Sequence, residues 1–287
     1  MRNWLIRTVR GSATAGIAVL WLGATVTLGE IEGQRLAGYR APRTADGKPN
    51  LNGIWQAMNT ANWDIEAHGA QMAPYPELVG SYLAQPGGLS VVESGTIPYK
   101  PEALARKKEN VQKRLTIDPS NRDQGDPEAK CFLPGVPRAT YMPFPFQIVQ
   151  GPDQFWIAYE FASASRFIPM RKRDPAPVDS WMGQSEGRWD GETLVVDVTG
   201  QNGKSWFDRA GNFMTDATHV VERYTAIRPD ALMYQATIED PSLYTRPWKI
   251  SMPLYRRLEE NGRLIEFKCI TFSEPILYHT LVKKPGR

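Results

Sequence analysis

Cysteine, histidine and unbalanced charge are all scarce in this chain. Its 287 residues include two cysteines and three histidines, and 34 basic residues face 31 acidic ones. The Gly-x-Ser-x-Gly elbow, the phosphate-binding glycine loop and the His-Glu-x-x-His motif are absent, so the sequence indicates none of the enzyme classes that depend on them and no cofactor. What the chain does have is 41% hydrophobic and 10% aromatic residues, which suits a globular protein with a substantial core. A collagen, a coiled coil and a polytopic membrane protein are excluded.

The net charge of +3 comes entirely from the start of the chain. Residues 1–29 contain Arg2, Arg7 and Arg10 and no acidic residue, so the rest of the chain holds equal numbers of basic and acidic residues. Nucleic-acid binding needs a clustered basic surface, and a neutral body therefore argues against a nucleic-acid partner. The basic cluster between residues 106 and 114 also contains Glu109, and we interpret it as a solvated helix face.

Residues 11–29 carry no charge and follow the arginine-rich start. This pattern predicts an export signal that leaves the amino terminus in the cytoplasm and the body in the periplasm. Nineteen uncharged residues come close to the ~20 that span a bilayer, and Thr27-Leu28-Gly29 matches the Ala-x-Ala cleavage pattern poorly. Two alternatives stay open: a cleaved signal peptide with a soluble product, or a retained anchor that contacts the inner membrane through residues 11–29.

Export changes the interpretation of the two cysteines. Cys131 and Cys269 have no second Cys or His at metal-ligand spacing beside them, so no metal site is predicted. An oxidising compartment favours a disulfide between them. The alternative is that both are small buried hydrophobic side chains.

The sequence predicts a mainly β fold in a single domain. Prolines interrupt residues 30–146, which are expected to wrap over the remainder with one helix at 101–115 and a short strand at 51–56. Residues 147–287 alternate strand-forming runs with turn residues, and the last run predicts a strand over 263–272. The turns are Gly151-Pro152-Asp153, Asp190-Gly191, Pro229-Asp230 and Asn261-Gly262. Eight to ten antiparallel strands in such a meander should close into a barrel or strongly curved sheet.

The loop 200–218 is the first candidate for function, because long loops at the rim of a sheet often carry it. Asp216 could hold the imidazole of His219 in one tautomer and form an acid–base pair, with Arg209 stabilising an anion. This hypothesis implies an isomerase, lyase or hydrolase. The alternative is structural: Asp208 and Arg209 form an ion pair that closes the loop, and His219 is a hydrogen-bonded residue at a strand end.

Aromatic and cationic residues suggest a ligand site. Guanidinium groups stack on aromatic rings and bind carboxylates through two hydrogen bonds, although pairing of the arginines with nearby acidic residues is an alternative. The candidate ligand-binding residues are Trp206, Phe213, Arg246, Trp248, Tyr255, Arg138 and Tyr141.

Four stretches resemble an uncharacterised exported bacterial protein family: DPEAKCFLPGVPRATYMPFPFQIVQ at 126–150, GRWDGETLVVDV at 187–198, WFDRAGNF at 206–213 and HVVERYT at 219–225. The resemblance covers roughly residues 38–282 and implies no reaction, cofactor or catalytic residue. Gly53-Ile54-Trp55 also resembles the Gly-x-Trp that opens lipocalin-like barrels, but the long Pro-rich segment after it departs from the compact lipocalin pattern.

Two functions fit these observations. The first is a periplasm-facing β-protein, soluble or membrane-tethered, that binds a small apolar molecule or serves as an accessory subunit of a membrane complex. The second is the enzyme with the Asp216/His219 pair. Because the body is neutral, we expect ligand recognition to depend on shape, aromatic surface and a few polar groups, and not on long-range charge attraction.

Overall fold

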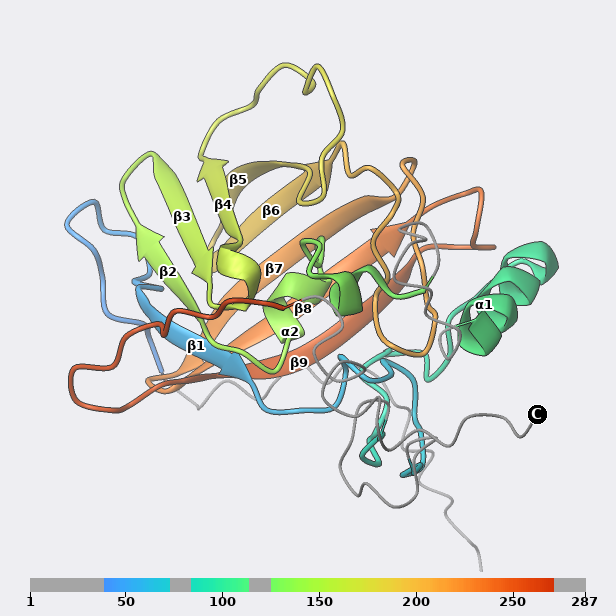
Figure 1. Ribbon diagram of the computed structural model, residues 1–287. Coiled ribbons are helices and arrows are strands. Elements are labelled where there is room, and N and C mark those ends of the chain that lie inside the picture. The colour runs from blue at the N-terminus through green and yellow to red at the C-terminus, as the bar shows by residue number, and fades with distance from the viewer. Residues whose placement is uncertain (1–38, 73–83, 114–124, 271–287) are drawn as a thin grey trace, which may run out of the picture.

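The computed structural model describes residues 39–72, 84–113 and 125–270 (Figure 1). The predicted signal or anchor at residues 11–29 lies outside them. In these three ranges no helix has both the length and the apolar character needed to cross a bilayer.

The described residues form one antiparallel sheet that curls into a nearly closed barrel (Figure 1). Its nine strands follow the spatial order β4-β3-β2-β1-β9-β8-β7-β6-β5. The strands are β1 Gly53–Ala57, β2 Phe146–Gln150, β3 Gln154–Tyr159, β4 Ser165–Pro169, β5 Gln184–Asp190, β6 Thr193–Thr199, β7 His219–Arg228, β8 Ala231–Glu239 and β9 Trp248–Arg256. The helices are α1 Pro101–Lys113 and α2 Arg138–Tyr141, with the 3-10 turns η1 Pro127–Lys130 and η2 Phe161–Ser163. The predicted mainly β, barrel-like fold is confirmed.

Turn chemistry and alternation set the register of the sheet. The predicted turns at 151–153, 190–191 and 229–230 join β2 to β3, β5 to β6 and β7 to β8. Inward and outward positions alternate along each strand, and the inner face of β8 buries Leu232, Tyr234, Ala236 and Ile238. Helix α1 begins at Pro101, the predicted residue.

The barrel departs from the sequence prediction at β1 and at its carboxyl-terminal end. The short strand predicted at 51–56 forms as β1, but it does more than wrap over the sheet, because it pairs with both β2 and β9. The edge of β9 is then occupied, and the predicted strand 263–272 is wrong for its described part: residues 263–270 are irregular. They cross the surface instead, where Phe267 packs on Phe144 and Phe161 with ring centroids 4.6 and 5.6 Å apart.

The junction of β1 with β9 depends on Gly53. Its φ of +149° lies in a region that other residues rarely adopt, and a Cβ there would collide with the guanidinium of Arg256. That guanidinium lies over the ring of the buried Trp55, 4.2 Å from its centroid, and donates to the Asn52 carbonyl at 2.8 Å. One arginine from the last strand thereby holds the first strand in place.

The predicted disulfide is confirmed. Cys131 and Cys269 are bonded, with their Cα atoms 5.5 Å apart. The bridge ties the irregular segment 263–270 to the residue that follows η1. In the chain-entropy model, a loop of this length stabilises the fold by about 5 kcal/mol. A structural disulfide also indicates an oxidising, exported location.

The two edge strands, β4 and β5, meet at the seam of the barrel. Since nine strands alternate in direction, the first and the last of the order run the same way. Parallel neighbours need a connection of about a dozen residues or more, and residues 170–183 supply it. Side chains join the seam, where Nη2 of Arg166 donates to Ser185 Oγ at 2.9 Å.

A buried ion pair lies inside the barrel next to the seam. Nη2 of Arg166 also lies 2.6 Å from Oε2 of the fully buried Glu222. The other carboxylate oxygen accepts hydrogen bonds from the hydroxyls of Tyr224 and Tyr234 at 2.9 and 2.8 Å. Burial raises the pKa of both phenols well above the usual value, so they remain donors.

Replacing Glu222 should destabilise the barrel strongly. Glu222→Gln leaves Arg166 buried without its counter-charge, and we expect the free energy of unfolding in urea to fall by about 3–5 kcal/mol. Glu239→Gln, at a half-exposed position on β8, is the matched control and should change stability by no more than about 0.5 kcal/mol. Similar losses in the two variants would contradict this account.

Candidate functional site: an aromatic pocket beside α1

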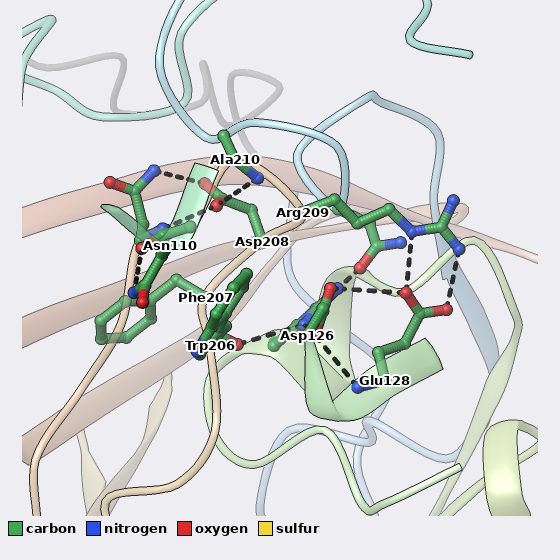
Figure 2. A network of polar contacts seen from close by, with 12 residues as sticks. Asn110, Asp126, Glu128, Trp206, Phe207, Asp208, Arg209 and Ala210 are labelled. Atoms are coloured by element: carbon green, nitrogen blue, oxygen red, sulfur yellow. Dashed lines mark hydrogen bonds and ion pairs between the residues drawn. The ribbon is translucent and has the colours of Figure 1, made fainter. Parts of the chain in front are cut away.

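The loop between β6 and β7 presents two aromatic side chains together. Trp206 and Phe213 face each other across an isolated antiparallel bridge. The carboxylate of Asp208 closes the intervening turn by accepting from the backbone N–H groups of Ala210 and Asn212 at 2.9 and 3.2 Å (Figure 2). Its second oxygen accepts from the Asn212 side chain at 2.6 Å and from the Ile65 N–H at 3.0 Å. Four donors thus fix the turn that positions the two rings.

A cavity of about 600 Å³ lies between this loop and α1. Aromatic rings form much of its wall, including Phe132 and Trp181, which stack with centroids 4.7 Å apart. The guanidinium of Arg106 reaches in from α1 and lies 4.4 Å from the centroid of Phe213. The lining residues are Arg106, Glu109, Asn110, Lys113, Gly125, Pro127, Phe132, Trp181, Asn202, Gly203, Lys204, Trp206, Phe213 and Met214. An apolar body and a cationic group therefore share one cavity.

The charged residues of the lining are mostly basic. Among the described lining residues, Arg106, Lys113 and Lys204 are basic and Glu109 is acidic. Glu109 also forms an ion pair with Lys113 one helical turn away. The guanidinium of Arg106 and the ammonium of Lys204 are thus placed to attract an anionic group.

A buried network of charges supports the wall of the pocket. The guanidinium of Arg138 binds both oxygens of Asp126 at 2.7 and 2.8 Å and donates to Asn62 at 2.8 Å. It also donates to the Trp206 carbonyl at 3.4 Å. Asp126 precedes Pro127 of the lining, so one guanidinium links two parts of the wall.

A second ion pair extends this network. Nε and Nη2 of Arg209 bind the two oxygens of Glu128 at 2.7 and 2.8 Å (Figure 2). Glu128 also lies 3.3 Å from the Arg138 guanidinium. The contact joins the turn of the β6–β7 loop to η1, the 3-10 turn that contains Pro127 of the lining.

Two of the buried carboxylates next to the pocket, those of Glu128 and Asp208, differ in their pKa shifts. Burial would raise the pKa of Glu128, but the guanidinium groups of Arg209 and Arg138 outweigh burial and hold it below its usual value. For Asp208, burial and the nearby Asp64 carboxylate raise the pKa to about 7. The N–H donors around Asp208 oppose that rise because they favour the charged form. Glu128 is therefore ionised at neutral pH, whereas the raised pKa of Asp208 lies close to neutral pH.

The structure brings together some of the predicted ligand-binding residues. Trp206 and Phe213 line the pocket, and Arg138 supports it from behind. Tyr141 is buried and donates to the Phe207 carbonyl at 2.8 Å. The predicted role of Arg138 in ligand contact thus becomes one of positioning the wall.

The predicted group on β9 does not assemble into one site. Trp248 is buried in the barrel, with its ring 5.5 Å from that of Phe207. Tyr255 projects from the outer face, and Arg246 lies exposed before the strand. Alternation along β9 places Trp248 and Tyr255 on opposite faces, whereas Arg246 and Trp248 line one depression of about 260 Å³.

His219 lies on the outer face of β7, away from the pocket lining. Its Nε2 is 2.8 Å from Oδ1 of Asp197 on β6, and its Nδ1 is 3.6 Å from Oε2 of Glu239 on β8. Asp216 is exposed in the preceding turn. The carboxylates beside the imidazole therefore come from neighbouring strands. Likewise, Arg209 pairs with Glu128 and not with its neighbour Asp208.

Several lining residues were missed by the sequence interpretation. Arg106 was assigned to a solvated helix face, and Phe132 and Trp181 were not singled out. They lie far from Trp206 and Phe213 in the sequence, and no local spacing pairs them. The sequence held one signal for Phe132: it directly follows Cys131, and a disulfide at Cys131 holds this part of the chain in place.

A comparison of the chain with protein-family models and with curated proteins found no match. Within the described ranges, no group of three or more His, Cys, Asp or Glu side chains is arranged to hold a metal ion. The pocket itself must therefore guide the functional interpretation.

The ion pairs of Glu128 should make stability depend on pH. Glu128→Gln should lower the free energy of unfolding by about 3 kcal/mol at pH 7. A depressed pKa stabilises the fold above the unfolded value near 4.5, and this contribution is lost as the pH falls through the folded-state pKa. The difference between wild type and variant, measured by urea unfolding from pH 7 to 3, should therefore shrink in acid.

Glu102→Gln, at an exposed position in α1, is the control and should show almost no difference across this range. A deficit in Glu128→Gln that stays constant down to pH 3 would contradict the role given to the carboxylate charge.

Proposed function

We propose that the protein is an exported β-protein that binds a small molecule with an apolar, aromatic body and an anionic group in the pocket beside α1. The observation that carries this proposal is the placement of the Arg106 guanidinium over Phe213 in a cavity walled by aromatic rings. Small-molecule sites combine aromatic side chains with polar groups that fix the orientation of the ligand, and a volume of about 600 Å³ lies in the usual range of such sites.

The aromatic and the basic parts of the cavity would contribute different interactions. Aromatic rings lose unfavourable contact with water when they bury an apolar ligand, and each stacked pair adds about 0.5–1.5 kcal/mol. A hydrogen bond to a charged partner contributes about 1.5–3 kcal/mol. The apolar walls would supply affinity, and the basic residues would select anionic ligands over neutral ones.

Export is part of the proposal. The disulfide supports an oxidising compartment, and the arginine-rich start with residues 11–29 supports transport to the periplasm. The accessory-subunit hypothesis stays a prediction that pocket occupancy does not address. We do not extend the proposal to an enzyme, because His219 contacts Asp197 outside the pocket lining.

Two fluorescent probes that differ in charge test the proposal. Anilinonaphthalenesulfonate carries an aromatic body with a sulfonate, and phenylnaphthylamine has the same body without the charge. We expect both to bind the folded protein, and Arg106→Gln to weaken the sulfonate about tenfold, the loss expected for one charged hydrogen bond, while changing the neutral probe by less than about twofold.

Lys108→Gln, at an exposed position of the same helix outside the lining, should leave the binding of both probes unchanged. Thermal unfolding of each variant shows that the fold is intact. Equal weakening of the two probes by Arg106→Gln, or no effect on either, would overturn the proposal.

A further inference from the structure

The outer face of β2, β3 and β4 carries a continuous apolar row. Val149, Trp156 and Phe167 are 48%, 48% and 42% exposed. Val149 lies opposite Trp156 in the register, and Trp156 lies opposite Phe167, with the two rings 6.4 Å apart. Single exposed apolar residues are common, but rows on adjoining strands mark interaction surfaces.

Basic side chains border this row. Connection 170–183 begins just after β4 with Arg171, Lys172 and Arg173, all exposed. Arg173 lines a depression of about 240 Å³ together with Phe167. Asp174 and Asp179 follow in the same connection, which keeps a basic excess. Aromatic rings beside arginine and lysine suit the headgroup region of a bilayer with anionic lipids.

The described chain begins at the same end of the barrel. Tyr39 lines a depression with Pro229 of the β7–β8 turn, and Arg43 pairs with Glu192 beside the β5–β6 turn at 2.8 Å. The β2–β3 turn lies at this end too, because the end of β2 pairs with the start of β1, which pairs with the end of β9 beside the start of β8. Trp156 and Phe167 are close to that turn in the strand register.

Chain length brings the apolar amino-terminal segment to this end. Only residues 30–38 separate residues 11–29 from Tyr39, and nine residues span at most about 30 Å. A bilayer that holds residues 11–29 therefore lies within reach of the apolar row. We propose that the face formed by Val149, Trp156, Phe167 and the basic run 171–173 docks on an anionic bilayer surface.

Side-chain footprinting of the full chain tests this docking. The chain is inserted into nanodiscs of phosphatidylcholine alone or of phosphatidylcholine with phosphatidylglycerol, and hydroxyl-radical oxidation is mapped by mass spectrometry. We expect the oxidation of Trp156 and Phe167 to fall several-fold in the anionic discs compared with the neutral ones. Met58, exposed just beyond the other end of β1, should be oxidised equally in both.

Charge variants separate the bilayer from other occupants. Arg171→Gln with Lys172→Gln should abolish the added protection in anionic discs, whereas Arg263→Gln with Lys268→Gln, two exposed charges elsewhere, should retain it. Protection that is absent, or equal in both kinds of disc, overturns the proposal. Protection that grows with protein concentration in detergent without lipid also overturns it, in favour of a second copy of the chain. None of these readouts depends on occupancy of the pocket, so this proposal and the proposed function can fail separately.

Discussion

A single buried cation, the guanidinium of Arg138, constrains the region from which the pocket is built. Burying an arginine is costly unless every donor finds a partner, and this side chain finds its partners in η1, in residue 62 and in the loop before β7. Satisfying one charge thus fixes three segments that the sequence separates widely. This requirement positions part of the pocket wall, because Asp126, next to Pro127, and the carbonyl of Trp206 both accept hydrogen bonds from the Arg138 guanidinium.

The Glu128–Arg209 ion pair extends the same charge network, because Glu128 contacts both Arg138 and Arg209. Each charge in the network is balanced by a neighbour whose own position is set by backbone contacts. Asp126, for example, also accepts from the Glu128 N–H at 3.0 Å at the start of η1. Rigidity of this kind preorganises a cavity, because the walls need not be ordered by the ligand. The apolar rings of the pocket can then remain in place without a bound molecule to hold them.

Local signals predicted the fold well, and long-range contacts limited the prediction of the site. Turn residues and alternation identified the hairpins of β2–β3, β5–β6 and β7–β8, because these patterns act over a few residues. The strand predicted over 263–272 had equally good local signals, but its described residues, 263–270, are irregular because β1 occupies the edge of β9. Trp206 and Phe213 were found from their shared loop, whereas Arg106 belongs to a helix that no pattern relates to that loop. Arg138 was selected for its chemistry, and only the tertiary partners revealed that it is a positioning residue.

The pairing of β1 with β9 also determines the order in which the protein can fold. One edge of residues 53–57 pairs with β2, but the other needs a partner strand that starts at residue 248, so the first of the described strands is among the last to be paired on both edges. Contacts this distant slow folding, because a large loop must close before they form. In a chain exported amino terminus first, β1 can pair with β2 once residue 150 has emerged, but its other edge stays open until β9 follows. Because β1 has only five residues, this open edge offers another chain little backbone to pair with.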